Sequence, residues 1–239
     1  MTAVTPTPEP SEANRRNASW REGVRAGLSV APTFVAVNTA FGLAAQVAGV
    51  PAWAAVALTL GVFAAPAQFA IAELAARGPS AMVQMIVVGI LINLRFFVMS
   101  LTLAQLFGPV PRARLLLSAQ LVVASTHLMT FFRARREPPV EAHAYFRGVA
   151  AGLIPAPVLG TALGLAFGRA LSPVLAFGTT LLLPVYFALL LANDVKGRAE
   201  VAAAVGSFVL TPIVEYVLPG WGTFVAALAI GALITASER

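Results

Sequence analysis

Residues 83–107 read VQMIVVGILINLRFFVMSLTLAQLF, and this stretch decides the class of the fold. A helix rises about 1.5 Å per residue, so about 20 apolar residues cross the hydrocarbon core of a bilayer. Asn93 and Arg95 lie near the middle of the stretch. An arginine at that depth costs at least about 2.5–3.5 kcal/mol, so both side chains require polar neighbours inside a helical bundle. The pair predicts a polar functional site at mid-depth; the alternative is an arginine held in a purely structural ion pair.

The composition of the whole chain is that of a membrane domain. The 239 residues are 59% hydrophobic and 11% charged, whereas soluble domains are about 25% charged. There is no cysteine and there are two histidines, so we expect no thiol chemistry, no metal site and no cofactor. The net charge of +6 comes from residues that flank apolar segments rather than form a stripe, which argues against nucleic-acid binding. No catalytic motif is present, so we do not expect an enzyme.

Eight apolar segments predict an all-α, polytopic transmembrane bundle of seven to eight spans. They cover residues 23–47, 52–76, 83–107, 115–132, 146–167, 173–191, 199–218 and 223–235. The last is the shortest and is predicted to be a tilted span, a partial span or an interfacial helix. Residues 1–20 are polar and proline-rich and are predicted to be a disordered cytoplasmic tail. Residues 21–239 then form a single transmembrane domain.

The basic residues predict the orientation of this bundle. With eight crossings and the N-terminus inside, 12 basic residues lie on the inner side and 3 on the outer side. Lys and Arg are enriched in the cytoplasmic loops of membrane proteins. We therefore expect both termini in the cytoplasm.

A weak internal repeat relates the two halves of the chain, at about residues 22–136 and 141–236. The dipeptide GL at 27–28 with Pro32 is echoed by GL at 152–153 with Pro157, and GLA at 42–44 is echoed at 164–166. Secondary transporters often contain such repeats. The sequence leaves open whether the repeat is parallel or inverted, and chance similarity among small residues is the alternative.

Pro66 and Gln68 mark a second polar position, in the middle of the second segment. A mid-span proline removes one backbone hydrogen bond and frees a carbonyl, which is tolerated only beside protein or a cavity. Broken helices of this kind bind zwitterions, because exposed N–H groups face a carboxylate and freed carbonyls face an ammonium. An ordinary proline kink is the alternative.

Three further polar residues complete the set of candidates. Glu73 has two possible partners, Arg95 at depth or Arg77 one helical turn away. Asn38 in the first segment is a candidate substrate ligand. His127 in the fourth segment is a candidate for proton coupling or gating; the alternative is a histidine that hydrogen-bonds a neighbouring helix.

Two of these motifs resemble the AzlC family of branched-chain amino acid permeases. The family motifs read close to AGSAQF and NLRH; here they are AAPAQF at residues 64–69 and NLRF at 93–96. The resemblance covers about residues 23–191. Members of the family usually have an Asp-Glu pair in the fourth segment, and here Thr126-His127 takes its place.

The resemblance implies a secondary transporter that exports branched-chain or other small neutral amino acids across the bacterial inner membrane by alternating access. It also implies a small, AzlD-like membrane subunit, for which we expect a docking surface of small residues at Gly160, Gly164 and Gly168. Asn93, Arg95, Gln68, Pro66 and Asn38 would bind substrate; Glu73 and His127 would couple or gate. A channel or passive facilitator for a small polar solute is the alternative, because few acids lie at depth.

Overall fold

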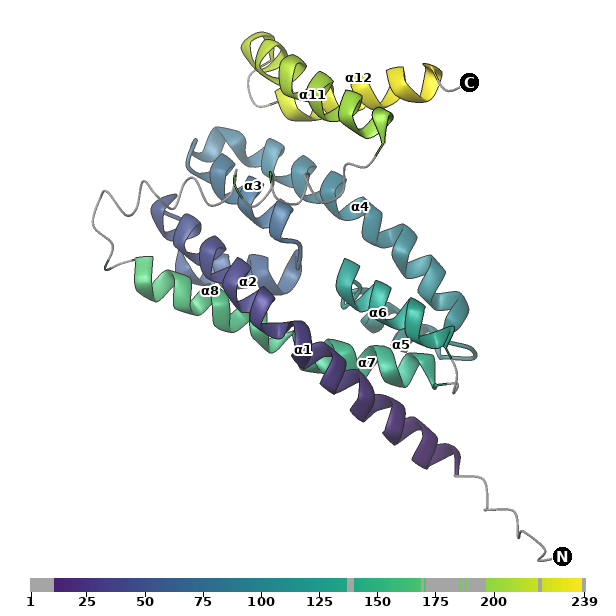
Figure 1. Cartoon of the computed structure of the whole chain (residues 1–239). Helices are drawn as coiled ribbons and strands as arrows, with labels where there is room; N and C mark the ends of the chain where they lie inside the picture. The colour runs from purple at the N-terminus through teal and green to yellow at the C-terminus, as the bar shows by residue number, and fades with distance from the viewer. Residues whose placement is uncertain are drawn as a thin grey trace, which may run out of the picture.

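The computed structural model describes residues 11–136, 140–168, 197–218 and 221–237 together with the single residues 170, 185 and 188. This part of the chain consists of helices and turns and contains no strand, which confirms the predicted all-α class (Figure 1). Most of the predicted sixth segment, residues 173–191, lies outside the described residues.

Four stretches of the described chain are long and apolar enough to cross a membrane. They are Glu12–Val47, which is α1; Pro79–Leu106, which joins the short 3-10 turn η1 (Pro79–Ala81) to α4 (Met82–Leu106); Ala142–Gly168, which joins α7 (Ala142–Leu153) to α8 (Pro155–Gly168); and Ala199–Val217 within α11 (Arg198–Val217). The eighth predicted segment is α12, Gly222–Ser237. The chain is therefore an integral membrane protein. The described part contains four candidate spans, so the predicted seven to eight spans are not confirmed.

Residues 12–20 of the predicted disordered tail are helical, because α1 begins at Glu12; residues 1–10 lie outside the described chain. Ser11 is the N-cap, and its hydroxyl accepts a hydrogen bond from the Asn14 amide at 3.4 Å. Glu12 adds a negative charge to the first turn, where the helix dipole favours it. These two residues stabilise the start of α1. The following turns pack against α7, where the buried Ser19 hydroxyl accepts a hydrogen bond from the Glu141 amide at 3.1 Å.

The second predicted segment is a hairpin rather than a single span. It consists of α2 (Ala52–Gly61) and α3 (Ala65–Ala75). Ala55 near the start of α2 and Ala72 near the end of α3 share one buried cluster with Phe41 of α1. A straight helix would separate these alanines by about 25 Å, so α3 returns to the end at which α2 entered. We call α2–α3 the first hairpin.

The fourth predicted segment is also a hairpin, and it enters from the opposite end of α1. It consists of α5 (Arg112–Ala119) and α6 (Ala124–Ala134). At the end of α6, Arg133 pairs with Glu22 near the start of α1, with Nη2 and Oε2 3.2 Å apart. At the tip, the Gln120 side chain donates a hydrogen bond to the Gly61 carbonyl of the first hairpin at 2.9 Å. The tips of the first hairpin and of this second hairpin therefore meet.

The two hairpins change the side on which three basic residues lie. Arg77, after the first hairpin, lies at the C-terminal end of α1, whereas Arg112 and Arg114, which begin the second hairpin, lie at its N-terminal end. Single crossings of the second and fourth segments, as predicted, would place each of these arginines on the other side, and the two hairpins do not support that prediction. Most arginines of the described chain now gather at the N-terminal end of α1: Arg15, Arg16, Arg21, Arg25, Arg112, Arg114, Arg133, Arg135, Arg136 and Arg147.

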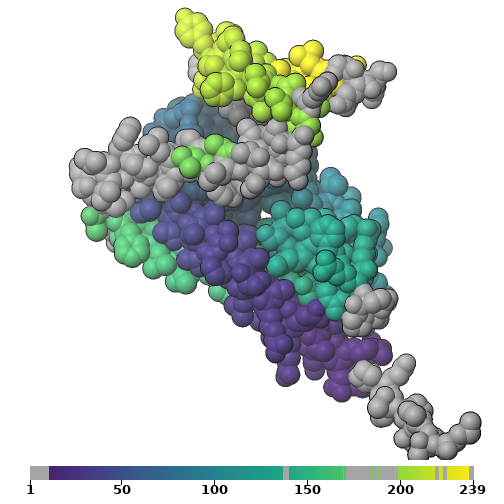
Figure 2. Space-filling view, in the orientation of Figure 1, coloured from purple at the N-terminus to yellow at the C-terminus, as the bar shows by residue number. Residues whose placement is uncertain are grey.

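The longest helix, α1, packs side by side with α7–α8 and runs parallel to them (Figure 1). A Cβ built on Gly27 would meet the backbone of Val149 and Gly152, and one built on Gly164 would lie 2.7 Å from the Cα of Gly42. Only glycine permits so close an approach of two backbones. Figure 2 shows α1 running across this face of the molecule beside α6.

The C-terminal pair α11–α12 lies beyond α4 in Figure 1, and α12 adjoins α3 and α4 through Ala227 and Leu228. Glu215 connects the pair to the first hairpin. One carboxylate oxygen lies 3.2 Å from Nη1 of Arg77, and the other accepts a hydrogen bond from the Gly222 amide at 2.9 Å. Glu215 is therefore a structural link at the C-terminal end of α1.

Candidate functional site

A cavity of about 200 Å³ lies where the two hairpin tips meet α1 and α8. Its lining comes from four regions far apart in the sequence: Thr33, Phe34, Val37 and Asn38 of α1; Phe63, Ala65 and Gln68 of the first hairpin; Ser125 of the second; and Pro157 of α8. None of these residues is charged. The cavity is smaller than the roughly 300–1,000 Å³ of pockets for drug-sized ligands, so it suits a small solute of zero net charge.

The first hairpin turns at residues 62–64, and this turn opens the cavity to a helix N-terminus. Phe63 has φ +46°, in the left-handed region that bulky residues rarely adopt. Ala64 is extended, and Pro66 lies in the first turn of α3. Helix α2 cannot continue through Pro66, because the ring lacks an amide hydrogen and clashes with the preceding turn. Pro66 was predicted to break a helix in the middle of a span; the chain does break here, and Pro66 lies in the first turn of α3 and so sets its direction.

The second hairpin turns at residues 120–123 and presents a second helix N-terminus. Val123 is extended, as its β-branched side chain favours. The Thr126 hydroxyl accepts a hydrogen bond from the Val123 amide at 2.9 Å and donates to the Leu121 carbonyl at 3.0 Å. This cap fixes the start of α6 and leaves Ser125 facing the cavity. The positive ends of two helix dipoles, those of α3 and α6, thus converge on one small space.

Two buried amide oxygens in the cavity have no hydrogen-bond partner within the described chain. They are Oδ1 of Asn38, which is 3% exposed, and Oε1 of Gln68, which is 1% exposed. The Asn38 nitrogen is engaged, because it donates to the Phe34 carbonyl at 2.9 Å. A buried polar atom left unpaired costs about 1–3 kcal/mol. Both oxygens are therefore acceptors that a bound donor would satisfy.

The cavity has the groups that a zwitterionic amino acid requires. The first N–H groups of a helix have no partner within the helix, so the starts of α3 and α6 can bind a carboxylate. The free oxygens of Asn38 and Gln68 can accept hydrogen bonds from an ammonium group. Phe34, Val37 and Phe63 form an apolar wall for an aliphatic side chain. This arrangement needs no charged residue.

The structure does not bring Asn93 and Arg95 to the cavity. The Asn93 side chain donates to the Gly89 carbonyl of its own helix at 2.7 Å. Arg95 is exposed on α4, and its guanidinium lies 4.9 Å from the centre of the Phe96 ring. Neither residue lines the cavity, and α4 as a whole contributes nothing to its lining. The prediction that they form one site with Gln68 is not supported by this geometry.

The two candidates for coupling lie in different places. Glu73 is 63% exposed and pairs with Arg77 at 3.3 Å, which is one of its two predicted partners; the other, Arg95, lies against the Phe96 ring instead. His127 lies between α6 and α4, with Nε2 2.9 Å from the Thr102 hydroxyl. Its Nδ1 is buried and has no partner among the described residues. Ser125, which lines the cavity, is only two residues before His127. Of the two coupling candidates, His127 is therefore the one near the cavity.

Sequence reasoning missed most of the apolar lining. Phe34, Val37 and Phe63 do not stand out in a chain that is 59% hydrophobic. Only the structure shows that they line a cavity. Ser125 and Pro157 had signals: a hydroxyl within an apolar segment, and a proline that interrupts another.

A family model described as AzlC protein matches residues 29–171. The match covers more than half of the chain and contains every residue that lines the cavity. No curated protein and no solved structure matches the chain.

Proposed function

The chain belongs to the AzlC family of membrane permeases for amino acids, and on that premise we propose that it is a secondary transporter. Its substrates are branched-chain or other small neutral amino acids, exported across the bacterial inner membrane by alternating access. One observation carries the proposal: a neutral cavity in which two helix N-termini meet two unpaired, buried amide oxygens. A carboxylate and an ammonium on the same small molecule satisfy both.

The hairpins supply the two gates that alternating access requires. The first hairpin separates the cavity from the C-terminal end of α1, and the second separates it from the N-terminal end. The hydrogen bond from Gln120 to Gly61 joins their tips. Movement of one hairpin at a time would open the cavity to one side only, which is the alternation that a secondary transporter requires.

A parallel internal repeat is part of this proposal. The two members of the repeated pattern, around Gly27 and Gly152 and around Gly42 and Gly164, lie in α1 and in α7–α8 and face each other across the parallel contact. Equivalent positions meet in this way when two units are related by an axis along the membrane normal. The rest of the second half includes residues outside the described chain.

Counterflow in liposomes tests the function and separates it from the channel alternative. Liposomes that contain purified protein are loaded with unlabelled leucine and diluted into labelled leucine. A carrier accumulates label transiently, because internal substrate speeds its return; a channel does not. The proposal fails if leucine, isoleucine and valine all enter at the rate of protein-free liposomes, and equilibration without trans-stimulation would favour the facilitator.

Single cysteines test the orientation, since the natural chain contains none. We expect Ser11→Cys and Arg114→Cys to react only with reagents that reach the cytoplasm, and Ser80→Cys, after the first hairpin, to react in intact cells with an impermeant maleimide. The physical reason is that each hairpin returns to the side from which it enters. Eight simple crossings predict the reverse for Arg114 and Ser80, so labelling on those sides would contradict the hairpins while Ser11 stays unchanged.

A small AzlD-like subunit remains the proposed partner, but its docking surface must differ from the predicted one. Gly160 and Gly164 are buried against α1 and are not available to another protein. The part of α4 that carries Arg95 and Val98 supports the proposal better, because both side chains are exposed and neither lines the hollow beside α12. A guanidinium at mid-depth needs a polar neighbour. If the subunit covers this face, Arg95→Leu should reduce its co-purification, and an undiminished yield would exclude the surface.

A further inference from the structure

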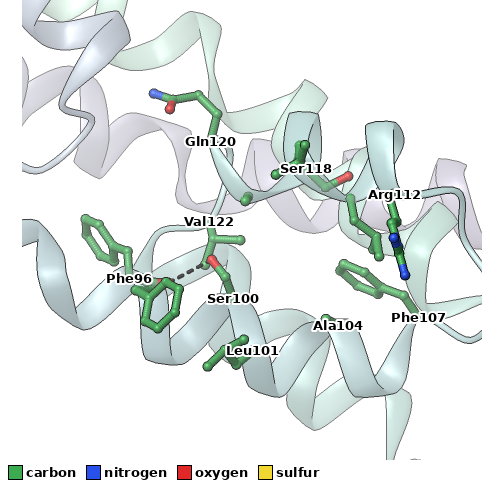
Figure 3. Close-up of a pocket in the computed structure, with 13 residues that line it drawn as sticks. Phe96, Ser100, Leu101, Ala104, Phe107, Arg112, Ser118, Gln120 and Val122 are labelled. Carbon is green, nitrogen blue, oxygen red and sulfur yellow. Dashed lines mark hydrogen bonds between the residues drawn. The ribbon is translucent and has the colours of Figure 1, made fainter.

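A second, larger hollow lies on the outside of the bundle, between α4 and α5 (Figure 3). It has a volume of about 620 Å³, and it does not share a single lining residue with the neutral cavity. Its walls are Phe96, Phe97, Leu101 and Ala104 of α4 and Leu115, Leu116 and Ala119 of α5, with Arg112 at one end. We call it the lateral groove.

The interior of the lateral groove offers no free polar side chain. The Ser100 hydroxyl donates to the Phe96 carbonyl at 2.7 Å, the bond drawn in Figure 3. Ser118 is hydrogen-bonded to Nε2 of His143 at 3.0 Å, and Gln120 donates to Gly61. A hydrocarbon chain fits such a surface, whereas a polar solute would lose hydrogen bonds to water without replacing them.

The length of the lateral groove matches half a bilayer. It extends along α4 from Phe96 to Phe107, which is about 16 Å of helix. The hydrocarbon core of a membrane is about 30 Å thick. Phe107 is at the end of α4, where its ring lies 5.0 Å from that of His143 and 5.2 Å from that of Phe146. The groove therefore runs from one membrane surface to mid-depth, the space of one acyl chain of one leaflet.

The surface end of the lateral groove is positively charged. In Figure 3 the Arg112 side chain points toward Phe107 at this end. Arg114 and Arg147 both act electrostatically on His143, the neighbour of Phe107. Within the described chain, none of these three arginines forms an ion pair with a carboxylate. Basic pockets between membrane helices bind the phosphate groups of lipids.

We propose that the lateral groove is a binding site for an anionic glycerophospholipid of the leaflet at the N-terminal end of α1. One acyl chain lies along Leu101 and Ala104, and the phosphate binds Arg112. The lipid supports α5, whose C-terminal end leads to Gln120 and its bond to the first hairpin. Occupancy of the groove therefore stabilises the contact between the hairpin tips. The site does not depend on which solute the cavity carries.

Native mass spectrometry of the purified full-length protein measures this binding directly, with dioleoylphosphatidylglycerol as the probe and the zwitterionic phosphatidylcholine of the same chains as reference. We expect one tightly held anionic lipid. Arg112→Gln should weaken it about fivefold, the equivalent of about 1 kcal/mol for one basic residue near an anionic group. Arg16→Gln, at an exposed arginine of α1 outside the groove, is the matched control and should retain the lipid.

A second variant fills the lateral groove without changing its charge. Ala104→Trp places an indole where the acyl chain would lie and should remove the bound lipid, whereas Gln105→Trp, on the next and exposed position of α4, should not. Equal retention of the lipid by Ala104→Trp and Gln105→Trp would overturn the proposal, as would equal binding of the two lipids. Because lipid is measured without transport, a failed counterflow assay leaves this result unaffected.

Discussion

Replacing Gly164 by leucine is expected to prevent the protein from folding. Even a Cβ at this position would lie 2.7 Å from both the Cα of Gly42 and the amide nitrogen of Leu43, and it would overlap the Thr39 carbonyl. Backbone atoms cannot rotate away as a side chain does, so α1 and α8 would have to separate along much of their contact. Overpacking a core costs typically about 1–3 kcal/mol, and a clash with backbone lies at or above the upper end.

The measurement for Gly164→Leu is the yield of monodisperse protein in detergent, followed by thermal unfolding. Gly231→Leu is the matched control, because Gly231 is a helical glycine of α12, and beyond its own helix no atom of the described chain lies within 4 Å of an added Cβ. It should be recovered at the wild-type yield. A folded Gly164→Leu protein that had lost only a partner subunit would restore the predicted docking surface and contradict the packing described above.

Replacing Gln68 by methionine is expected to lower transport strongly while leaving the protein as stable as before. A hydrogen bond between an ammonium and the Gln68 oxygen contributes about 1.5–3 kcal/mol, which corresponds to roughly 10- to 150-fold in apparent affinity. The oxygen has no partner in the described chain. Its removal therefore costs the empty protein nothing, and the melting temperature should stay the same or rise.

Labelled leucine uptake into liposomes and a thermal melt of the same preparation measure these two effects. Gln105→Met, which makes the same chemical change on the exposed side of α4, should alter neither. Wild-type affinity in Gln68→Met would remove the cavity from the transport mechanism. A fall in melting temperature together with activity would mean that Gln68 has a structural role instead.

The apolar segments were predictable, but the path of the chain through them was not. Residues 52–76 are apolar enough for one crossing, and hydropathy counts apolar residues without recording the direction of the chain. Pro66 signalled a break. A break that bends a helix and a break that reverses the chain look the same in sequence. The chain reverses here because Ala72 packs in the same buried cluster as Phe41.

The candidate site was predicted in part, for a similar reason. Asn38 and Gln68 contrast with their apolar surroundings, and the structure brings both to the cavity. Arg95 differs even more from its apolar surroundings, yet it lies on α4 outside the cavity. A charged residue within a span predicts that a polar neighbour exists, but not which surface provides that neighbour. The glycines illustrate the same point: spacing by four predicts a close helix contact, and the contact is internal.

The parallel pairing of α1 with α7–α8 also has a consequence for biosynthesis. Gly42 meets Gly164, which is synthesised roughly 120 residues later. When α1 enters the bilayer, the helix that its glycines require does not yet exist, and two hairpins must be placed before it arrives. Contacts between distant parts of a chain form late and slowly. During that interval the face of α1 that carries Gly23, Gly27 and Gly42 lacks the helices that cover it in the complete protein.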